Sequence, residues 1–558
     1  MENKPIARTL RLLSQLMELY DENPFKVKSI AAAAFNVDKL PFLISGKSFE
    51  EIEKISGIGK STATKIWELI QTKNIAELND YISKTPPGVM EMLQIKGIGP
   101  KKVKTIWKEL EIDNVGELYY ACNENRLVEA KGFGLKTQEE IKKVIEFKMA
   151  SNGQFLYAQV ESFADSLLEM LKNFFKTDLV SFTGSYRRKC EIISELSMLI
   201  ASPNSSEAAD FLSGIPGLNA VEISENKIKL EAESGIKIFV SLCPADDYSY
   251  QLLLQTGNDE HVQEVLKRLD GETIKASSEK EVYTKAGLSY IEPELREGAN
   301  EFILAEAGKL PELIKFSDLK GTLHNHSTWS DGVHSIEEMA LFCRNELNLQ
   351  YLGMCDHSKS AFYANGLNET RLLAQHAEIN TLNQKLAPFK IFKGIESDIL
   401  FDGSLDYAPE ILATFDFVVA SVHSVLKMNE EKATSRLIKA IENPYTTILG
   451  HPTGRLLLSR SGYPIDYKKV IDACAENNVV IEINANPLRL DLDWRWHQYA
   501  IEKGVILSVN PDAHRKDGFY DMHYGVFVAR KGGVARENCL NSYTLEEITH
   551  FFAKKLLV

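Results

Sequence analysis

The spacing of apolar residues divides the chain into three stretches with different predicted structure. Over residues 5–20, 27–35 and 48–56 the apolar positions recur at helical spacing, which predicts short amphipathic helices. Between 150 and 310 a long predicted helix is followed by the strand-like runs LSMLIAS, KIKLEAES and IKIFVSL, which indicate an α+β segment. From 322 onward short β runs alternate with helical runs, and this alternation predicts a parallel α/β barrel.

One short pattern occurs three times in the helical part of the chain. The segments ISGIGKSTATKIWELI, LQIKGIGPKKVKTIWKEL and AKGFGLKTQEEIKKVIEF each place a G-x-G turn between two helices. The glycines permit a sharp turn, and the free N–H groups of the next helix favour an anion there. An ordinary tight turn between helices is the alternative. Because lysines follow each turn, we expect contacts to the DNA backbone without base readout. The expected DNA-binding residues are Gly57, Gly59, Lys60, Gly97, Gly99, Lys101 and Lys102.

Charge is distributed unevenly along the chain. The net charge is −14, but residues 1–150 hold 23 Lys and Arg against 21 Asp and Glu, so the remaining 408 residues carry −16. A neutral-to-basic first part can therefore bind phosphate although the whole chain is acidic. Eleven of the 12 histidines fall between 324 and 550, which indicates a site built from imidazoles in the predicted barrel.

Composition excludes several classes of protein. The seven cysteines lie far apart without a C-x-x-C pair, which argues against a disulfide scaffold and a zinc ribbon. The first residues mix charges into a helical pattern, and no stretch approaches the roughly 18 apolar residues of a membrane span. We therefore expect a soluble, cytoplasmic monomer that does not associate with membranes. The expected organisation is two hairpin regions (1–80 and 81–150), an α+β segment (151–310), a linker (311–321) and the barrel (322–558).

Nine His, Asp and Glu residues follow the β runs of the predicted barrel. H-x-H and D-x-H spacing directs neighbouring side chains to the same side of a strand, and residues after barrel strands meet at the C-terminal rim. Mixed imidazole and carboxylate ligands suit Zn²⁺, Mn²⁺ or Fe²⁺ better than Mg²⁺. The expected metal ligands are His324, His326, Asp331, His357, Glu396, His423, His451, Asp512 and His514.

These motifs resemble the PHP (polymerase and histidinol phosphatase) family. The resemblance implies a distorted seven-stranded barrel with three metal ions. It assigns His324, His326, Glu396 and Asp512 to one ion, Glu396, His423 and His451 to a second, and Asp331, His357 and His514 to a third.

Other residues near these motifs are further candidates for the catalytic site. Asp356 stands beside His357 and is expected to orient a ligand imidazole. Arg455, Arg460 and Arg489 are expected either to hold a substrate phosphate or to form ordinary surface ion pairs.

The segment FTGSYRRKCEIISELSMLIAS (182–202) resembles the nucleotidyltransferase palm of family X DNA polymerases, and ENPFKVKSIAAAAF (22–35) resembles their N-terminal domain. The resemblance implies phosphate binding by Gly184, Ser185 and the two arginines, above all Arg188. In some family members a hairpin lysine forms a Schiff base with an abasic sugar. Lys65 matches that position, although a solvated helix lysine is the favoured interpretation.

The palm departs from its family at the metal site. The family supplies a D-x-D pair and a third Asp on a neighbouring strand, but Glu195, Ser197 and Phe239 stand at these positions. A neutral hydroxyl and a phenyl ring cannot replace carboxylates, so two Mg²⁺ ions are not expected to bind there. The aromatic pair before the family's T-G is also changed, to Leu254 and Gln255.

Together these motifs resemble bacterial family X DNA polymerases with a C-terminal PHP domain over essentially the whole chain. We expect a DNA-repair-type metal-dependent phosphoesterase, a 3′–5′ exonuclease or 3′-end-processing enzyme, that acts on gapped, nicked or 3′-ended DNA without polymerase activity. The alternatives are an active gap-filling DNA polymerase, a small-molecule phosphomonoesterase and a non-enzymatic DNA-binding scaffold.

Overall fold

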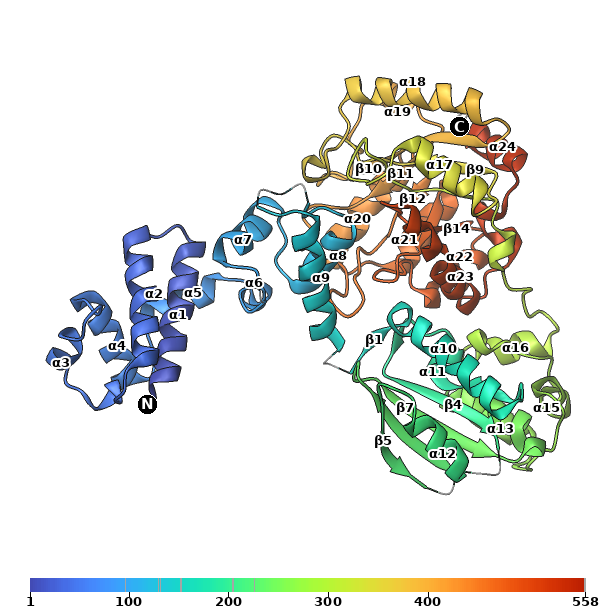
Figure 1. The fold of residues 1–558 in the computed structure, drawn as a ribbon. Coiled ribbons are helices and arrows are strands. Elements are labelled where there is room, and N and C mark those ends of the chain that lie inside the picture. Colours follow the sequence, from blue (N-terminus) through green and yellow to red (C-terminus); the bar gives the residue numbers. More distant parts are fainter. Residues whose placement is uncertain are drawn as a thin grey trace. The chain divides into compact units, whose positions relative to one another are not determined.

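The computed structural model describes residues 1–95, 97–128, 130, 132–150, 153–202, 205–224 and 226–555. The chain divides into two compact units, Met1–Glu146 and Phe147–Val558 (Figure 1). The expected boundary between 150 and 151 adjoins residues 151–152, which lie outside the described ranges. None of the helices in the described part of the chain has the length and apolar character of a membrane span.

The first unit is helical, as its apolar spacing predicts. Helix α1 buries Ile6, Leu10, Leu13 and Met17, and packs this face on α2. The described helices are α1 (Asn3–Leu19), α2 (Pro24–Lys39), α3 (Phe49–Glu53), α4 (Lys60–Thr72), α5 (Ala76–Lys84), α6 (Pro87–Met92), α7 (Pro100–Lys104) with the π-turn η2 (Thr105–Glu109), α8 (Val115–Asn123), and α9 (Leu135–Ala150), which crosses the unit boundary; the 3-10 turn η1 is Ile44–Gly46.

The G-x-G turns differ in what each glycine does. Gly57, Gly97 and Gly132, the first of each pair, have φ of +80°, +93° and +90°, which side chains rarely adopt. The second glycines cap the next helix with ordinary φ, and a Cβ on Gly59 or Gly99 would meet nothing within 4 Å. The fold therefore requires the first glycine, while the second leaves open space at the start of the next helix.

The second unit begins with an α+β palm region (green in Figure 1). Its five-stranded sheet has the order β2-β4-β7-β6-β5, and only β4 and β7 pair in parallel. The elements are β1 (Phe155–Leu156), α10 (Tyr157–Phe175), β2 (Val180–Phe182), α11 (Gly184–Arg187), β3 (Ile192–Ile193), β4 (Glu195–Ala201), α12 (Ser205–Ser213), β5 (Leu218–Ile223), β6 (Lys227–Ala232) and β7 (Lys237–Cys243). The three strand-like runs predicted from the sequence are β4, β6 and β7.

A helical thumb region follows the palm and has its own apolar core around Leu253, Val265 and Tyr283. Its elements are η3 (Ala245–Asp247), α13 (Tyr248–Thr256), α14 (Asp259–Arg268), α15 (Glu279–Lys285), η4 (Pro293–Leu295) and α16 (Glu301–Glu306). The segment expected as a linker (311–321) does not run free, because it contributes Ile314 and Leu319 to the barrel core.

The C-terminal region confirms the predicted parallel barrel. Seven strands pair in parallel in the order β8 to β14, and a further parallel bridge between Asn325 and Ala513 joins the two ends. Strands such as β11 and β13 are buried at every position, as expected of strands covered on both faces. The strands are β8 (Gly321–Thr322), β9 (Tyr351–Met354), β10 (Lys390–Asp398), β11 (Phe417–Ser421), β12 (Ile448–Leu449), β13 (Val480–Asn484) and β14 (Leu507–Asn510).

Helices and 3-10 turns connect and cover the barrel strands. The helices are α17 (Ile336–Asn345), α18 (Glu369–Leu386), α19 (Pro409–Leu412), α20 (Glu430–Ile441), α21 (Tyr467–Glu476), α22 (His497–Glu502), α23 (Met522–Lys531) and α24 (Leu545–Lys555). The 3-10 turns are η5 (Phe316–Asp318), η6 (Phe362–Ala364), η7 (Trp494–Trp496), η8 (Lys516–Asp521), η9 (Arg536–Asn538) and η10 (Leu540–Ser542).

Candidate metal centre

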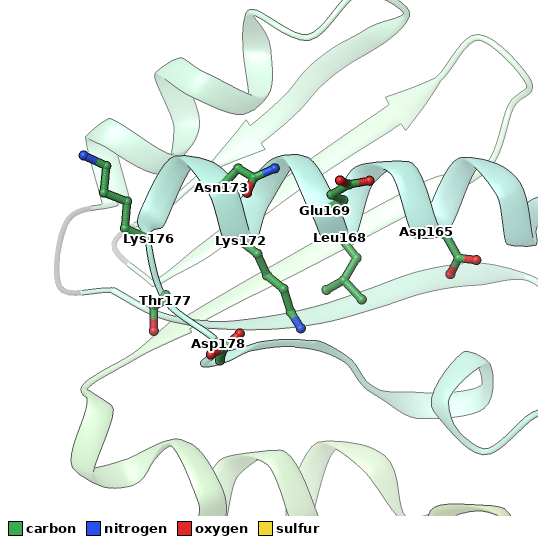
Figure 2. A pocket seen from close by; sticks show the side chains of 8 residues that line it. All are labelled: Asp165, Leu168, Glu169, Lys172, Asn173, Lys176, Thr177 and Asp178. Carbon is green, nitrogen blue, oxygen red and sulfur yellow. The ribbon is translucent and has the colours of Figure 1, made fainter.

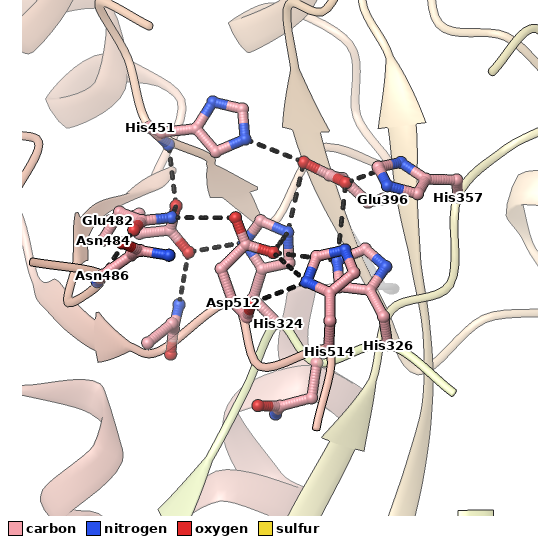
Figure 3. A network of polar contacts seen from close by, with 12 residues as sticks. His324, His326, His357, Glu396, His451, Glu482, Asn484, Asn486, Asp512 and His514 are labelled. Atoms are coloured by element: carbon pink, nitrogen blue, oxygen red, sulfur yellow. Dashed lines mark hydrogen bonds and ion pairs between the residues drawn. The ribbon is translucent and has the colours of Figure 1, made fainter. Parts of the chain in front are cut away.

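The barrel gathers all nine predicted His, Asp and Glu residues at the C-terminal ends of its strands. Figure 3 labels all of them except Asp331 and His423. Each strand end contributes because parallel strands all finish at the same rim. Each residue lies near the C-terminal end of a strand or in the loop after it: β8 (His324, His326, Asp331), β9 (His357), β10 (Glu396), β11 (His423), β12 (His451) and β14 (Asp512, His514). His334, His376, His497, His523 and His550 are absent from the clusters found among the described residues.

Glu396 lies at the middle of this cluster and is 1% exposed. Its Oε1 is 3.1 Å from His324 Nε2, 3.1 Å from His423 Nε2 and 2.9 Å from His451 Nε2. Its Oε2 is 2.9 Å from His357 Nδ1. His326 Nε2 lies 3.7 Å from Oε2, so one carboxylate faces five imidazoles that come from four different strand ends.

Two further carboxylates complete the cluster. Asp512 Oδ1 is 3.0 Å from His326 Nε2. The Asp331 carboxylate is 3.5 Å from His357 Nε2 and 3.4 Å from His514 Nε2. The carboxylates thus alternate with the imidazoles across the whole site.

The field of these carboxylates favours cations. Burial alone would lower the pKa of His324 and His357, but the surrounding carboxylates raise both well above the ordinary value. In the same way the pKa of His423 is raised to about 9, against burial, by Glu396 and Asp398. A divalent cation would benefit from the same field.

His326 behaves differently from the other imidazoles. Burial, reinforced by repulsion from His514 and His357, lowers its pKa to about 4. His326 is therefore neutral at physiological pH, which is the form that binds a metal ion.

The ligand atoms form four compact groups in which all atoms lie within 4.8 Å of one another. These groups are His326/Asp331/His357/His514, His324/His451/Asp512, His324/His326/Glu396 and His357/Glu396/His423. The first contains the complete third set implied by the PHP resemblance. His423 and His451, which that resemblance gives to one ion, fall into different groups.

Two carboxylates that the sequence analysis did not single out hold the imidazoles in place. Glu482, fully buried on β13, accepts hydrogen bonds from His324 Nδ1 and the His451 backbone N–H, both at 2.7 Å. Asp398 accepts from His423 Nδ1. Each carboxylate binds the nitrogen remote from Glu396, so it orients the ring and leaves Nε2 facing the cluster. The E-S-D spacing on β10 places Asp398 on the same face as Glu396, which is a sequence signal for Asp398, but Glu482 has no such local signal.

Asp356 does not orient an imidazole, contrary to expectation. Its carboxylate accepts from the backbone N–H and hydroxyl groups of Ser327 and Ser330, and from Gln375 Nε2. Asp356 is fully buried, and burial raises its pKa despite these hydrogen bonds. It fixes the loop that leads to Asp331, so it positions a ligand through the backbone.

The phosphate-holding role expected for Arg455 is also not supported. Its guanidinium donates to the backbone carbonyls of Arg489 and Leu490 and to Asp493 Oδ2, so it ties two loops together. Arg460 donates to the Gly454 carbonyl, and Arg489 is only 5% exposed. The sequence could not show this, because the acceptors of Arg455 lie more than 30 residues away and most are backbone atoms.

The hairpin turns present their predicted residues to solvent to different degrees. Lys60 and Lys101 are exposed beside Gly59 and Gly99. Lys102 lies over the Phe133 ring at 5.4 Å. Lys96 and Lys131 lie outside the described residues.

Lys65 lies on α4 and points to a carboxylate. Its ammonium group forms an ion pair with Glu77, which also binds Lys26 at 2.8 Å. This ion pair favours the interpretation of Lys65 as a helix lysine bound to a carboxylate.

The palm arginines are bound inside the protein. Arg187 forms a bidentate ion pair with Glu279 at 2.6 and 2.8 Å. Arg188, expected to grip a phosphate, donates to Glu297 at 2.9 Å and to the Thr256 carbonyl at 2.8 Å. The turn formed by Gly184 and Ser185 lies beside β4, but the arginines that follow it bind residues of the thumb region.

The strand register places the substituted palm positions together. Ser197 on β4 pairs with Phe239 on β7, and the Ser197 hydroxyl lies 3.3 Å from Glu195 Oε1. A Cβ on Gly184 would lie 3.8 Å from Ser197 Cβ. Ser197 thus lies beside the turn, with Phe239 opposite it on the neighbouring strand and Glu195 within reach of its hydroxyl.

A separate surface groove runs along α10 in the palm region (Figure 2). It is lined by both acidic and basic side chains, among them Asp165, Glu169, Lys172 and Asp178. It contains no histidine or thiol, and its mixed charges favour neither an anion nor a metal ion.

Comparisons with known proteins match both parts of the chain. A family model described as a helix-hairpin-helix domain matches residues 1–75, and a SAM-like helix-hairpin-helix tandem matches residues 89–146. The DNA polymerase/3′-5′ exonuclease PolX of Bacillus subtilis (strain 168) is 34% identical over 575 aligned residues, covering 99% of this chain and 100% of that protein. A probable phosphatase of Thermoanaerobacter sp. (strain X514) is 31% identical over 174 residues, covering 29% of this chain and 69% of that protein.

A probable phosphatase of Acetivibrio thermocellus is 27% identical over 200 residues, covering 34% of this chain and 78% of that protein. The phosphatase similarities are local, whereas the similarity to PolX extends over nearly the full length of both chains. Because this full-length similarity accompanies matching hairpin models and a seven-stranded barrel, the chain belongs to the PolX-type bacterial family X DNA polymerases with a C-terminal PHP domain.

Proposed function

We propose that this protein is a metal-dependent phosphoesterase that processes DNA ends, acting as a 3′–5′ exonuclease or 3′-end-processing enzyme through its barrel. The observation that carries the proposal is the convergence of nine histidine and carboxylate side chains at the barrel rim, with Glu396 in their middle and seven of the nine buried. Full-length similarity to a protein named as a DNA polymerase/3′-5′ exonuclease supports DNA as the substrate.

The residues present fit a cluster of divalent metal ions. Several buried atoms face one another without forming a well-aligned hydrogen bond, among them His324 Nε2, both nitrogens of His326, Asp331 Oδ2 and Glu396 Oε2. Buried polar groups normally have hydrogen-bond partners, so this concentration points to metal ligation. The donor set suits Mn²⁺, Zn²⁺ or Fe²⁺, and we propose three ions held by the nine residues. Such ions would supply a nucleophile at neutral pH and neutralise charge on a phosphate ester.

The side chains of the protein contribute orientation and charge. Glu482 and Asp398 hold His324 and His423 with Nε2 directed inward. Asp356 fixes the loop that leads to Asp331. In the overall reaction a water oxygen bonds to phosphorus, the P–O bond to the neighbouring nucleotide breaks, and the leaving oxygen takes a proton.

We further propose that the hairpin regions, 1–80 and 81–150, hold the DNA backbone. The open space beside Gly59 and Gly99, together with exposed Lys60 and Lys101, supports phosphate contacts at the starts of α4 and α7. Contacts to phosphate alone do not select a sequence, which suits an enzyme that processes many DNA ends.

The palm, in this proposal, does not catalyse nucleotide transfer. Two-metal transfer needs carboxylates to fix the ions, and Ser197 and Phe239 cannot provide them. The internal ion pairs of Arg187 and Arg188 support the same conclusion, since both guanidinium groups already hold acidic residues of the thumb region.

One experiment tests hydrolysis and polymerisation together. The purified protein is incubated with Mn²⁺ and end-labelled gapped DNA, with and without dNTPs, and shortening and extension are followed on the same gel. We expect shortening that is lost in His324→Ala/His326→Ala, and no extension in any reaction. Metal analysis that finds no bound ions in the folded protein, or wild-type hydrolysis by the double variant, contradicts the proposal.

Similarity to proteins named as probable phosphatases favours a second candidate, hydrolysis of small phosphomonoesters. A phosphomonoesterase would not depend on the hairpins. The DNA-end function therefore predicts that a hairpin variant such as Gly59→Ala loses activity on long DNA but retains activity on a mononucleotide.

A further inference from the structure

The two most deeply buried arginines of the described residues differ in what they contact. Arg296, in the thumb region, is 0% exposed and forms an ion pair with Glu279 at 2.6 Å. Arg436, on α20, is 1% exposed, and none of the described carboxylates forms an ion pair with it. Burial accordingly lowers the pKa of its guanidinium. A buried charge without an ion-pair partner is rare, which indicates a specific role for its hydrogen bonds.

The guanidinium of Arg436 donates to backbone carbonyls of two separate loops. Its Nε donates to the Leu400 carbonyl at 2.9 Å, and its Nη2 donates to the Ile399 carbonyl. Its Nη1 donates to the Ser424 carbonyl at 3.0 Å. Because the donors of a guanidinium point in fixed directions within one plane, the single side chain joins the loop after β10 to the loop after β11.

Both loops begin directly after a residue of the metal centre. Asp398 precedes Ile399, and His423 precedes Ser424. The Asp398 carboxylate accepts from His423 Nδ1 at 2.5 Å. The strands β10 and β11 pair only as far as Asp398 and Ser421, so the sheet does not hold the chain beyond this point. Arg436 therefore fixes the backbone on both sides of the hydrogen bond that orients His423.

The backbone beyond His423 has a conformation that needs support. Val425 has φ of +54°, which is an outlier for a β-branched residue. Arg436 Nη1 lies 3.5 Å from the Val425 carbonyl and 3.5 Å from Met428 Sδ. Such a conformation persists where the surrounding structure imposes it. The same guanidinium thus holds a strained segment beside the metal centre.

His423 is the ligand with the least cover from the rest of the barrel. Its side chain is 12% exposed, whereas the other eight are at most 7% exposed. Only one of the four ligand groups found among the described residues contains it, the group of His357, Glu396 and His423. A shift of His423 would therefore affect one group of ligands and leave the other groups complete.

We infer that Arg436 is a positioning residue that holds Asp398 and His423 in place, and through them one of the metal ions. This inference rests on the metal-dependent function proposed above. Loss of a partner behind a ligand imidazole lowers metal affinity about 10- to 100-fold. Arg436→Met, which keeps the length of the side chain but cannot donate, should weaken one Mn²⁺ site by about tenfold or more and leave the others unchanged.

The test titrates the metal-free full-length protein with Mn²⁺ by calorimetry and counts the ions that remain bound after desalting. We expect the Arg436→Met protein to retain one ion fewer than the wild-type protein. The double variant Arg436→Met/His423→Ala should bind Mn²⁺ within about twofold of His423→Ala alone, because residues that act through one ligand are not additive. If the two single losses multiply in the double variant, Arg436 does not act through His423 and the inference is overturned.

Two further variants separate positioning from a general role in stability. Arg436→Lys keeps the buried charge, but one ammonium group cannot bridge two loops as the guanidinium does, so the same site should weaken. Arg536→Met, which replaces an exposed arginine of η9, is the matched control and should bind as wild type. Melting curves of the metal-free proteins check the fold. Wild-type binding of all ions by folded Arg436→Lys, equal weakening of every site, or failure of both Arg436 variants to fold would overturn the inference.

The metal titration also distinguishes this inference from the function on which it rests, because it uses no DNA. A wild-type protein that binds the ions but hydrolyses no phosphoester contradicts the proposed function, while selective loss of one ion in Arg436→Met would still support the role of Arg436. An active enzyme whose Arg436→Met variant binds every ion as wild type would overturn that role alone.

Discussion

Replacing Glu482 with glutamine should weaken metal binding although Glu482 is not among the expected ligands. Glu482 Oε1 accepts from His324 Nδ1 at 2.7 Å and from Asn510 at 3.0 Å, and Oε2 accepts from the His451 backbone N–H at 2.7 Å. A glutamine has the same shape, but one of its two positions becomes an NH₂ group. In either orientation this group faces a donor, so at least one close hydrogen bond is lost.

The magnitude follows from the type of bond. Hydrogen bonds to charged groups contribute about 1.5–3 kcal/mol, and loss of a carboxylate behind a ligand histidine lowers metal affinity about 10- to 100-fold. A tenfold change corresponds to about 1.4 kcal/mol, so both ranges agree. We expect Glu482→Gln to bind Mn²⁺ about 10- to 100-fold more weakly and to need correspondingly more metal for activity.

The assay titrates metal-free protein with Mn²⁺ by calorimetry and repeats the activity measurement over the same metal concentrations. Glu442→Gln, which removes an exposed carboxylate after α20, is the matched control and should behave as wild type. A melting curve of metal-free protein checks that the fold survives. Unchanged Mn²⁺ affinity and activity in folded Glu482→Gln would refute the claim that this carboxylate orients His324.

Three other changes probe the hairpins, the palm and the thumb. Gly59→Ala should leave the melting temperature unchanged, because a Cβ there meets nothing within 4 Å. It should weaken DNA binding, measured by titration at several salt concentrations. Unaltered DNA binding would argue against a phosphate contact at this turn. Wild-type protein should extend no primer, whereas Glu195→Asp/Ser197→Asp/Phe239→Asp is expected to regain some extension; wild-type extension that is lost in Glu195→Ala would contradict the inactive palm. Burial would raise the pKa of Glu279, but its arginine partners hold it at about 2 instead of 4.5. This pKa contributes about 3 kcal/mol of stability above pH 4.5 that disappears as pH falls toward 2, so Glu279→Gln should lower the free energy of unfolding at pH 7 but not at pH 2, by denaturant titration.

The barrel and the cluster of histidines and carboxylates at its rim could be predicted from the sequence because both signals are local. Each β run is a short apolar segment, and each His or Asp motif follows one directly, so strand and ligand appear in the same few residues. Parallel strands end at one rim, which brings His324 and His514 together although 190 positions separate them in the sequence. The G-x-G turns were equally local, since two glycines and the next helix define them.

Residues that act through distant partners could not be assigned in this way. Glu482 occupies one position of a buried strand, and only the fold brings it to His324 from 158 residues away. Arg455 follows a ligand loop and resembles a phosphate-binding residue, but its partners are carbonyls of another loop. Asp356 stands next to a ligand in sequence, yet its carboxylate points to a serine loop. Sequence proximity to a site therefore did not show what these side chains contact.

The palm region and the barrel are joined by the helix that follows the metal-ligand loop of Asp512 and His514. On α23, Lys531 donates to Glu297 and to the Arg188 carbonyl, and Arg530 donates to Glu294 at 2.7 Å. Lys531 is only 3% exposed, so its loss would leave the partly buried Glu297 with Arg188 as its remaining ion-pair partner. The palm and thumb regions thus supply ion-pair and hydrogen-bond partners of α23 beside the barrel, a structural role that does not depend on nucleotide chemistry.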